Sequence, residues 1–312
     1  MEQHSDAAGT GPVNRDQQGT LALEAMDGYW KGSFRAMASP CEIFMEVDEE
    51  ALAWELLQSA AGEARRIEKK LSRYRDDNIV HQINNSLGHA VEVDAEVAQL
   101  LDFAQQCWQL SDGLFDITSG VLRRVWHFDG SSTIPDVAAV KALLPMIGWQ
   151  RVSWSSPYLT LPEGMEIDFG GIGKEYAVDR VLLQLQQLTD AGLLVNFGGD
   201  INTNGRSGGD GVWSIGIEDP GRLNSATAVL KIRQGAIATS GDARRYLQRD
   251  GKRYSHVLNP KTGWPVAHAP RSVSVAADTC TEAGILATIA LLQGKDAEAF
   301  LKRQDVRYRL YF

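Results

Sequence analysis

One segment of the sequence, Met165 to Leu188, predicts a strand that passes through a glycine-rich turn into the start of a helix. The glycines carry no side chain that would block a ligand, and the first turn of a helix has backbone N–H groups without intrahelical partners. Such a junction binds anions, and phosphate suits it. Lys174 adds a cation at the turn, and Asp168 lies just before it as a hydrogen-bond acceptor. The spacing matches neither a dinucleotide fingerprint nor a Walker loop, so a tight structural turn with a solvated lysine is the alternative.

A second segment, Ala236 to Val266, contains two turns of small residues with a hairpin signal at Asp250-Gly251 between them. His256 lies in this segment, a few residues before Asn259. Its imidazole is suited to carry a proton beside a phosphate. The alternative is a strand histidine that pairs with a cross-strand neighbour.

Glycine and aspartate also gather in the blocks SDGLFDITSGVLRRVW and LVNFGGDINTNG, and shorter blocks, MASP and LSRY, lie earlier in the chain. Together with the two segments above, these blocks occur in the order typical of the ApbE family, the FAD:protein FMN transferases, which the chain resembles. The resemblance runs from about Phe34 to about Gly294. The most specific blocks are DFGGIGKEYAVDR and the one that begins TSGD and continues through the histidine to NPKTG.

Composition is consistent with an enzyme of one large domain. The chain has 312 residues, is 44% hydrophobic and carries a net charge of −9, which argues against a nucleic-acid surface. The sequence contains no apolar run long enough to span a membrane and no secretory signal at its start. Residues 1–27 are polar and rich in small residues, so we expect a disordered leader before an ApbE-like domain over 28–312.

Cys41, Cys107 and Cys280 are widely spaced and form no CxxC motif. We expect them to be small buried hydrophobic residues of a protein in a reducing compartment, which favours a cytoplasmic location.

The coarse pattern predicts an α+β fold. Helical periodicity covers Ala51–Leu71, Val97–Leu110, Tyr176–Leu188 and Glu282–Leu292, and strands dominate from Leu193 to Val275. Such runs of helix and of antiparallel strand differ from the alternation of a doubly wound sheet. The resemblance adds a two-lobed single domain with mainly antiparallel sheets and flanking helices.

The resemblance also implies roles for individual residues. FAD would lie in a cleft between lobes with its pyrophosphate near the glycine turn. The implied FAD contacts are Met37, Tyr74, Leu114, Phe115, Asp116, Asp168, Lys174 and Leu258, the last through its backbone. His256 matches the family histidine best placed to help activate an acceptor hydroxyl. Without the resemblance, Met37, Leu114 and Phe115 would be interpreted as core residues. Asp116 would be interpreted as a turn residue.

The implied reaction is phosphoryl transfer. A threonine or serine hydroxyl of an acceptor flavoprotein attacks the FMN phosphorus of FAD, and AMP leaves. Charge grows on the phosphate oxygens, so Mg²⁺ is the expected stabiliser. Two alternatives remain open: an FAD pyrophosphatase that releases FMN and AMP to water, and a non-catalytic FAD-binding protein.

The implied metal site departs from the family pattern. Thr288 and Gly171, through its backbone carbonyl, match metal positions, but Gly284 stands where the family has an aspartate. The nearby Glu282 and Asp278 are the acidic residues considered as replacements. We therefore expect weakened Mg²⁺ binding, which Gly284→Asp would strengthen by adding an oxygen one helical turn from Thr288.

Overall fold

The computed structural model describes residues 20–129, 133–206, 210–219, 222–242 and 246–312. Its centre is an eight-stranded sheet in which all neighbouring strands are antiparallel. In spatial order the strands are β1 (Ala22–Met26), β2 (Tyr29–Ala36), β3 (Ser39–Met45), β7 (Leu193–Phe197), β8 (Asp200–Gly205), β11 (Gly235–Gly241), β16 (Ser272–Ala277) and β17 (Arg307–Tyr311).

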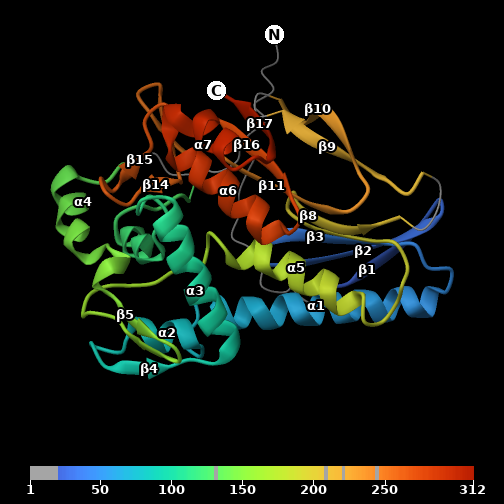
Figure 1. Ribbon diagram of the computed structural model, residues 1–312, viewed down its shortest axis with the longest axis horizontal. Coiled ribbons are helices and arrows are strands. Elements are labelled where there is room, and N and C mark those ends of the chain that lie inside the picture. The colour runs from blue at the N-terminus through green and yellow to red at the C-terminus, as the bar shows by residue number, and fades with distance from the viewer. Residues whose placement is uncertain (1–19, 130–132, 207–209, 220–221, 243–245) are drawn as a thin grey trace, which may run out of the picture.

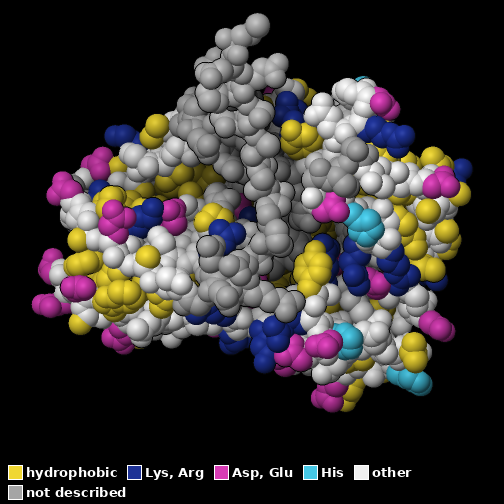
Figure 2. All heavy atoms as spheres, turned by 180° about the vertical axis from the view of Figure 1, so that it is seen from behind, with side chains coloured by type: hydrophobic (Ala, Val, Ile, Leu, Met, Phe, Trp, Pro, Cys, Tyr) yellow, Lys and Arg dark blue, Asp and Glu magenta, His cyan; other side chains and the backbone are white. Residues whose placement is uncertain are grey.

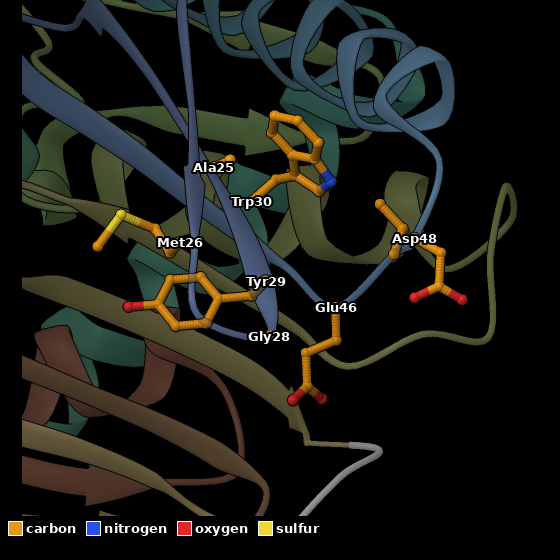
Figure 3. Close-up of a pocket in the computed structure, with 8 residues that line it drawn as sticks. Ala25, Met26, Gly28, Tyr29, Trp30, Glu46 and Asp48 are labelled. Carbon is orange, nitrogen blue, oxygen red and sulfur yellow. The ribbon is translucent and has the colours of Figure 1, made fainter.

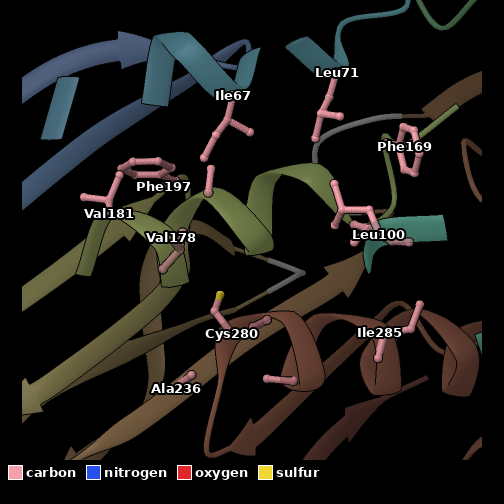
Figure 4. Packing of buried hydrophobic residues seen from close by; sticks show 14 of the residues in the cluster. Ile67, Leu71, Leu100, Phe169, Val178, Val181, Phe197, Ala236, Cys280 and Ile285 are labelled. Atoms are coloured by element: carbon pink, nitrogen blue, oxygen red, sulfur yellow. The ribbon is translucent and has the colours of Figure 1, made fainter. Parts of the chain in front are cut away.

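Three helices cover one face of this sheet (Figure 1). They are α1 (Glu50–Leu71), α5 (Gly173–Leu185) and α6 (Cys280–Leu292), and the short α7 (Ala297–Arg303) follows α6. α1 packs on β2, α5 on β7 and β8, and α6 on β11 and β16. Apolar residues three and four apart on α1 are buried, as a helix with one face on a core requires. Figure 4 shows Ile67 of α1 and Val178 of α5 facing the same core as Phe197 of β7.

The opposite face of the sheet packs against a hairpin of β9 (Trp213–Asp219) and β10 (Arg222–Ile232). Trp213 and Ile215 of the hairpin share a buried cluster with Ile237 of β11. Ala236 and Ala238, the neighbours of Ile237, belong instead to the core under the helices. Side chains alternate along a strand, so β11 places every second residue on the α6 side.

A second lobe lies beside the sheet, on the left of Figure 1. It contains α2 (Ile79–Asn84), β4 (Ala90–Glu92), α3 (Ala95–Leu110), η2 (Ile117–Arg124), α4 (Val137–Leu143), η3 (Leu144–Met146), η4 (Trp149–Arg151), β5 (Ser153–Ser155) and β6 (Tyr158–Thr160). The described elements are completed by the short η5 (Gly294–Asp296) between α6 and α7 and by two small hairpins, β12 (Tyr246–Arg249) with β13 (Lys252–Ser255) and β14 (Leu258–Asn259) with β15 (Trp264–Pro265). The α+β prediction is confirmed.

The predicted helices are present, with shifted ends. α5 begins at Gly173, three residues before the expected Tyr176, because the last glycine of the turn already has helical hydrogen bonding. The disordered leader was expected to reach residue 27, and this boundary is wrong. Ala22–Met26 form β1, whose backbone pairs with β2 at the edge of the sheet. Residues 1–19 lie outside the described part of the chain.

The structure bears on three expectations from composition. All three cysteines are buried and unpaired, as predicted. Within the described residues, no helix has both the length and the apolar character needed to cross a membrane. On the face shown in Figure 2, Lys and Arg side chains are interspersed with Asp and Glu, which is not the basic stripe of a nucleic-acid surface.

Candidate functional site

The glycine turn before α5 is held by Asp168. Its Oδ1 accepts a hydrogen bond from the Gly170 N–H at 2.9 Å, and its Oδ2 pairs with the guanidinium of Arg73. Arg73 also donates to the hydroxyl of the exposed Tyr74 at 2.7 Å. A methyl group on Gly120 would lie 2.7 Å from Cβ of Asp168, so only glycine allows η2 to approach this closely. The predicted contacts Tyr74 and Asp168 are therefore linked through Arg73.

Met37 reaches the same turn from the other side. It occupies the tight connection between β2 and β3, where both Met37 (φ 53°) and Ala38 (φ 57°) have left-handed backbone conformations. Residues with a Cβ adopt this conformation at a cost, and such strain often marks functional sites. A methyl group on Gly173 would lie 3.9 Å from Cε of Met37. The MASP block thus lies at the first residue of α5.

The SDGLFD block supplies a third wall. The ring of the buried Phe115 lies 3.0 Å from where a Cβ on Gly171 would stand, and Leu114 is partly buried beside it. Asp116 is buried, and it accepts hydrogen bonds from the N–H and hydroxyl of Thr118 and from the N–H of Trp149. Burial raises the pKa of Asp116, and these hydrogen bonds oppose that effect. Asp116 anchors the loop, and its FAD contact stays a prediction.

Lys174 points to the LVNFGGD block. Its Nζ forms an ion pair with Oδ2 of Asp200 at 2.5 Å, and the Asp200 side chain is only 3% exposed. Oδ1 of Asp200 accepts the N–H of Thr239 in the TSGD block at 3.2 Å. Burial alone would lower the pKa of Lys174, but the charges of Asp200 and Glu175 raise it above the usual range. Its contact with a phosphate stays a prediction.

His256 and Leu258 lie in the second lobe. The His256 ring meets the edge of Phe128 with 6.3 Å between centroids, and Phe128 stacks on Trp126 at 5.6 Å with 5° between planes. Leu258 packs against the cluster that contains Trp126.

Two ion pairs hold this region in place. Lys261 Nζ lies 3.3 Å from Oδ2 of Asp112 at the start of the SDGLFD block. Arg253 on β13 pairs with Asp242 of the TSGD block at 3.0 Å. The first pair connects the histidine segment to the SDGLFD block, and the second connects it to the start of its own block. The catalytic role of His256 stays a prediction.

The contact between α5 and α6 carries the predicted metal positions. Asp179 of α5 accepts hydrogen bonds from the N–H groups of Cys280 and Thr281 at 2.7 and 2.8 Å, which caps α6. Thr288 lies further along α6, with its hydroxyl 3.1 Å from that of Ser240. Glu282 and Asp278 are both exposed, and no described contact directs either carboxylate to this helix pair.

Gly284 lies against Glu175. A methyl group on Gly284 would stand 2.5 Å from Cγ and 3.2 Å from Oε1 of Glu175. Oε2 of Glu175 is buried and has no hydrogen-bond partner among the described residues. Burial, followed by the charge of Asp200, raises the pKa of Glu175. The expectation for Gly284→Asp therefore needs correction, because the new side chain would meet Glu175 before it could approach Thr288.

Two cavities of about 460 Å³ each are present in the described structure. One lies at the β1–β2 turn, with Tyr29 and Trp30 on different sides of β2 and Glu46 and Asp48 nearby (Figure 3), and contains none of the predicted site residues. The other lies between the sheet and the β9–β10 hairpin, and its lining includes Gly198, Gly199 and Thr239 of the motif blocks.

Comparison with known proteins decides the family. The ApbE family profile matches residues 37–312, which is most of the chain. The chain belongs to the ApbE family. An FAD:protein FMN transferase of Klebsiella pneumoniae is 32% identical over 280 residues, with 86% of this chain and 85% of that protein covered. One of Treponema pallidum is 31% identical, with 76% and 71% covered.

Solved structures of ApbE proteins share the fold. The ApbE protein of Thermotoga maritima superposes with a TM-score of 0.81 at 29% identity, over 90% of this chain and 94% of that one. The Pseudomonas stutzeri flavinyl transferase ApbE gives a TM-score of 0.76 at 28% identity, over 92% and 90%. The two-lobed, mainly antiparallel architecture is therefore that of the ApbE family.

Sequence reasoning missed four charged residues at this site. They hold the site together by contacts between distant segments, and they are Arg73, Glu175, Asp179 and Asp200. Arg73, Glu175 and Asp179 lie inside motif blocks that were singled out for other residues, and Asp200 lies in the LVNFGGDINTNG block, which was noted without an assigned role for any of its residues. Asp179 had a usable signal, because it follows Glu175 by four residues and so lies on the same face of α5.

Proposed function

We propose that this protein transfers the FMN moiety of FAD to a threonine or serine hydroxyl of an acceptor protein and releases AMP. The relatives named above are FAD:protein FMN transferases, and one of the similar structures is a flavinyl transferase. The observation that carries the proposal is the convergence of separate motif blocks on the first turn of α5. Met37 lies against Gly173, and Phe115 lies against Gly171. Asp168 accepts a hydrogen bond from the N–H of Gly170 in the same turn.

The chain's own residues suit a bound pyrophosphate. No side chain caps the start of α5, and the N-terminus of a helix favours negative charge. Arg73, fixed by Asp168 and Tyr74, places a positive group at this turn in addition to Lys174. The exposed ring of Tyr74 and the left-handed Met37 form apolar surfaces next to it, suited to a flavin or adenine ring. Leu114 and Leu258 are proposed as further FAD contacts.

His256 is proposed to accept the proton of the acceptor hydroxyl as that oxygen attacks phosphorus. Imidazole is the side chain most often used as a general base in enzymes. Its segment is tied to the FAD-binding block through Lys261 and Asp112. The hydroxyl oxygen then forms the phosphoester, and the AMP phosphate leaves with the bond electrons.

The α5–α6 contact fits a divalent cation, because it contains a buried carboxylate oxygen without a partner. Mg²⁺ would be held by Thr288 through its hydroxyl and by Gly171 through its carbonyl, while Gly284 contributes no side chain. When bound, the cation would stabilise charge on the phosphate oxygens. We also propose a cytoplasmic location, which the three unpaired buried cysteines favour.

The test is an incubation of the protein with FAD, Mg²⁺ and a candidate acceptor. Transfer gives AMP in equal amount with fluorescent flavin that stays on the denatured acceptor. A pyrophosphatase would give AMP and free FMN at the same rate with or without the acceptor. Bound FAD with no AMP would identify an FAD-binding protein without catalysis. Either of the last two results would overturn the proposal.

A further inference from the structure

The carboxylates between α5 and α6 are not equivalent. Asp179 has both oxygens in hydrogen bonds to α6 and Asn202. Asp200 is occupied by Lys174 and the N–H of Thr239. Oδ2 of Asp200 accepts no hydrogen bond but is paired with Lys174, whereas the buried Oε2 of Glu175 has neither a hydrogen bond nor an ion pair among the described contacts. A buried carboxylate without a partner is costly, and a bound cation is one way in which proteins offset that cost.

The helix register shows where this oxygen lies. Figure 4 shows α5 from Val178 to Val181 running opposite to α6 from Cys280 to Ile285. Asp179 contacts Cys280 at the start of α6, and Glu175, one turn earlier on α5, contacts Gly284, one turn later on α6. Four residues further in each direction are Gly171, in the turn just before α5, and Thr288 on α6. Glu175 therefore lies one step along the helix pair from both remaining metal positions of the site.

Glu175 also fills the space that Gly284 leaves. A side chain at position 284 would begin 2.5 Å from Cγ of Glu175 and 3.1 Å from its carboxylate carbon. The two positions thus share one volume, which has room for one carboxylate. The carboxylate present comes from α5 instead of α6.

We infer that Glu175 is the carboxylate ligand of the divalent cation and takes the place of a ligand at position 284. The cation is the one used in the proposed FMN transfer, so this inference rests on that function. The ligand set is then the Glu175 carboxylate, the Thr288 hydroxyl and the Gly171 carbonyl, completed by water and phosphate oxygens. All are oxygen ligands, which Mg²⁺ and Mn²⁺ prefer. The metal site therefore keeps one carboxylate ligand, which comes from α5 and not from α6.

Metal binding itself provides the test. Mn²⁺ is titrated into the full chain with FAD present, and free Mn²⁺ is followed by electron paramagnetic resonance. Glu175→Gln should weaken Mn²⁺ binding about tenfold or more. Glu282→Gln removes the same charge from an exposed position on α6 and should leave binding unchanged. Equal binding by wild type and Glu175→Gln would overturn the inference.

A double substitution checks the shared volume. Glu175→Gly combined with Gly284→Asp returns the carboxylate to α6 and should restore Mn²⁺ binding to near the wild-type value, whereas Glu175→Gly alone should bind Mn²⁺ about as weakly as Glu175→Gln. A double variant that is folded by circular dichroism and still fails to bind Mn²⁺ would refute the exchange.

Because these experiments measure Mn²⁺ binding and not activity, they separate this inference from the proposed function. Glu175-dependent binding without AMP release would reject FMN transfer alone, and FMN transfer with binding independent of Glu175 would reject this inference alone.

Discussion

Lys174 forms an ion pair with the buried Asp200, with 2.5 Å between Nζ and Oδ2, and this pair joins the first turn of α5 to the start of β8. Asp200 also accepts the N–H of Thr239 on β11. One carboxylate therefore fixes the helix N-terminus relative to two strands of the sheet. The cation beside the glycine turn is held in place before any ligand arrives.

Lys174→Met should affect stability and FAD binding together. It leaves Asp200 buried without its cation, which lowers the free energy of unfolding by about 3 kcal/mol. If Lys174 also contacts the phosphate, FAD affinity should fall about tenfold or more. The double variant with Asp200→Asn should recover part of the stability but not the affinity, as measured by urea unfolding and FAD titration. Unchanged FAD affinity in the single variant would remove Lys174 from the binding site.

Arg73→Gln should weaken FAD binding about tenfold, because Asp168 loses its partner and the turn loses a positive group. Arg75→Gln is the matched control. Arg75 lies two residues away, pairs with Asp77 at the surface and loses the same charge. Equal effects of the two substitutions in FAD titrations would show that only net charge matters.

His256→Ala should lower the rate of AMP release in the presence of acceptor by about 10² to 10⁴, with FAD affinity near normal. His127→Ala, an exposed histidine of the same lobe, should change neither quantity. An equal loss of binding and turnover in His256→Ala would assign this residue to FAD binding instead of proton transfer.

Asp179→Ala should lower the free energy of unfolding by about 2 to 4 kcal/mol, since it removes the acceptor for the first two N–H groups of α6, beside the N-cap Thr279, and leaves buried donors unpaired. Asp190→Ala removes an exposed aspartate just after the same helix and should cost far less. Thermal unfolding of the two variants makes the comparison. Similar melting temperatures would contradict the capping role.

Glu96 should make stability depend on acid pH. Hydrogen bonds from Arg66, opposed by burial and aided by Lys70 and Tyr176, hold the pKa of Glu96 well below its usual range. A lowered folded pKa gives stability that is present above the unfolded value of about 4.3 and lost as pH falls toward the folded value. Glu96→Gln should therefore flatten the loss of stability below that pH, which denaturant unfolding at several pH values would reveal.

The sequence predicted what depends on local pattern. Apolar spacing identified α1, and Asp250-Gly251 identified the β12–β13 hairpin. Resemblance to the ApbE family located the blocks of the site. The choice of partners was not predictable, since Arg73 and Asp168 are 95 residues apart and nothing in local pattern selects one aspartate over another. The edge strand β1 was missed because its residues are mostly exposed and show little apolar signal.

The contact between Glu175 and Gly284 also constrains how such a site can change over generations. A side chain at position 284 and the glutamate at 175 compete for one space, so the residues at these two positions should change together. Any one-step route between the two arrangements passes through a protein with two crowded carboxylates or with none. We therefore expect relatives to carry an acidic residue at one of these two positions and a small residue at the other, with few intermediates.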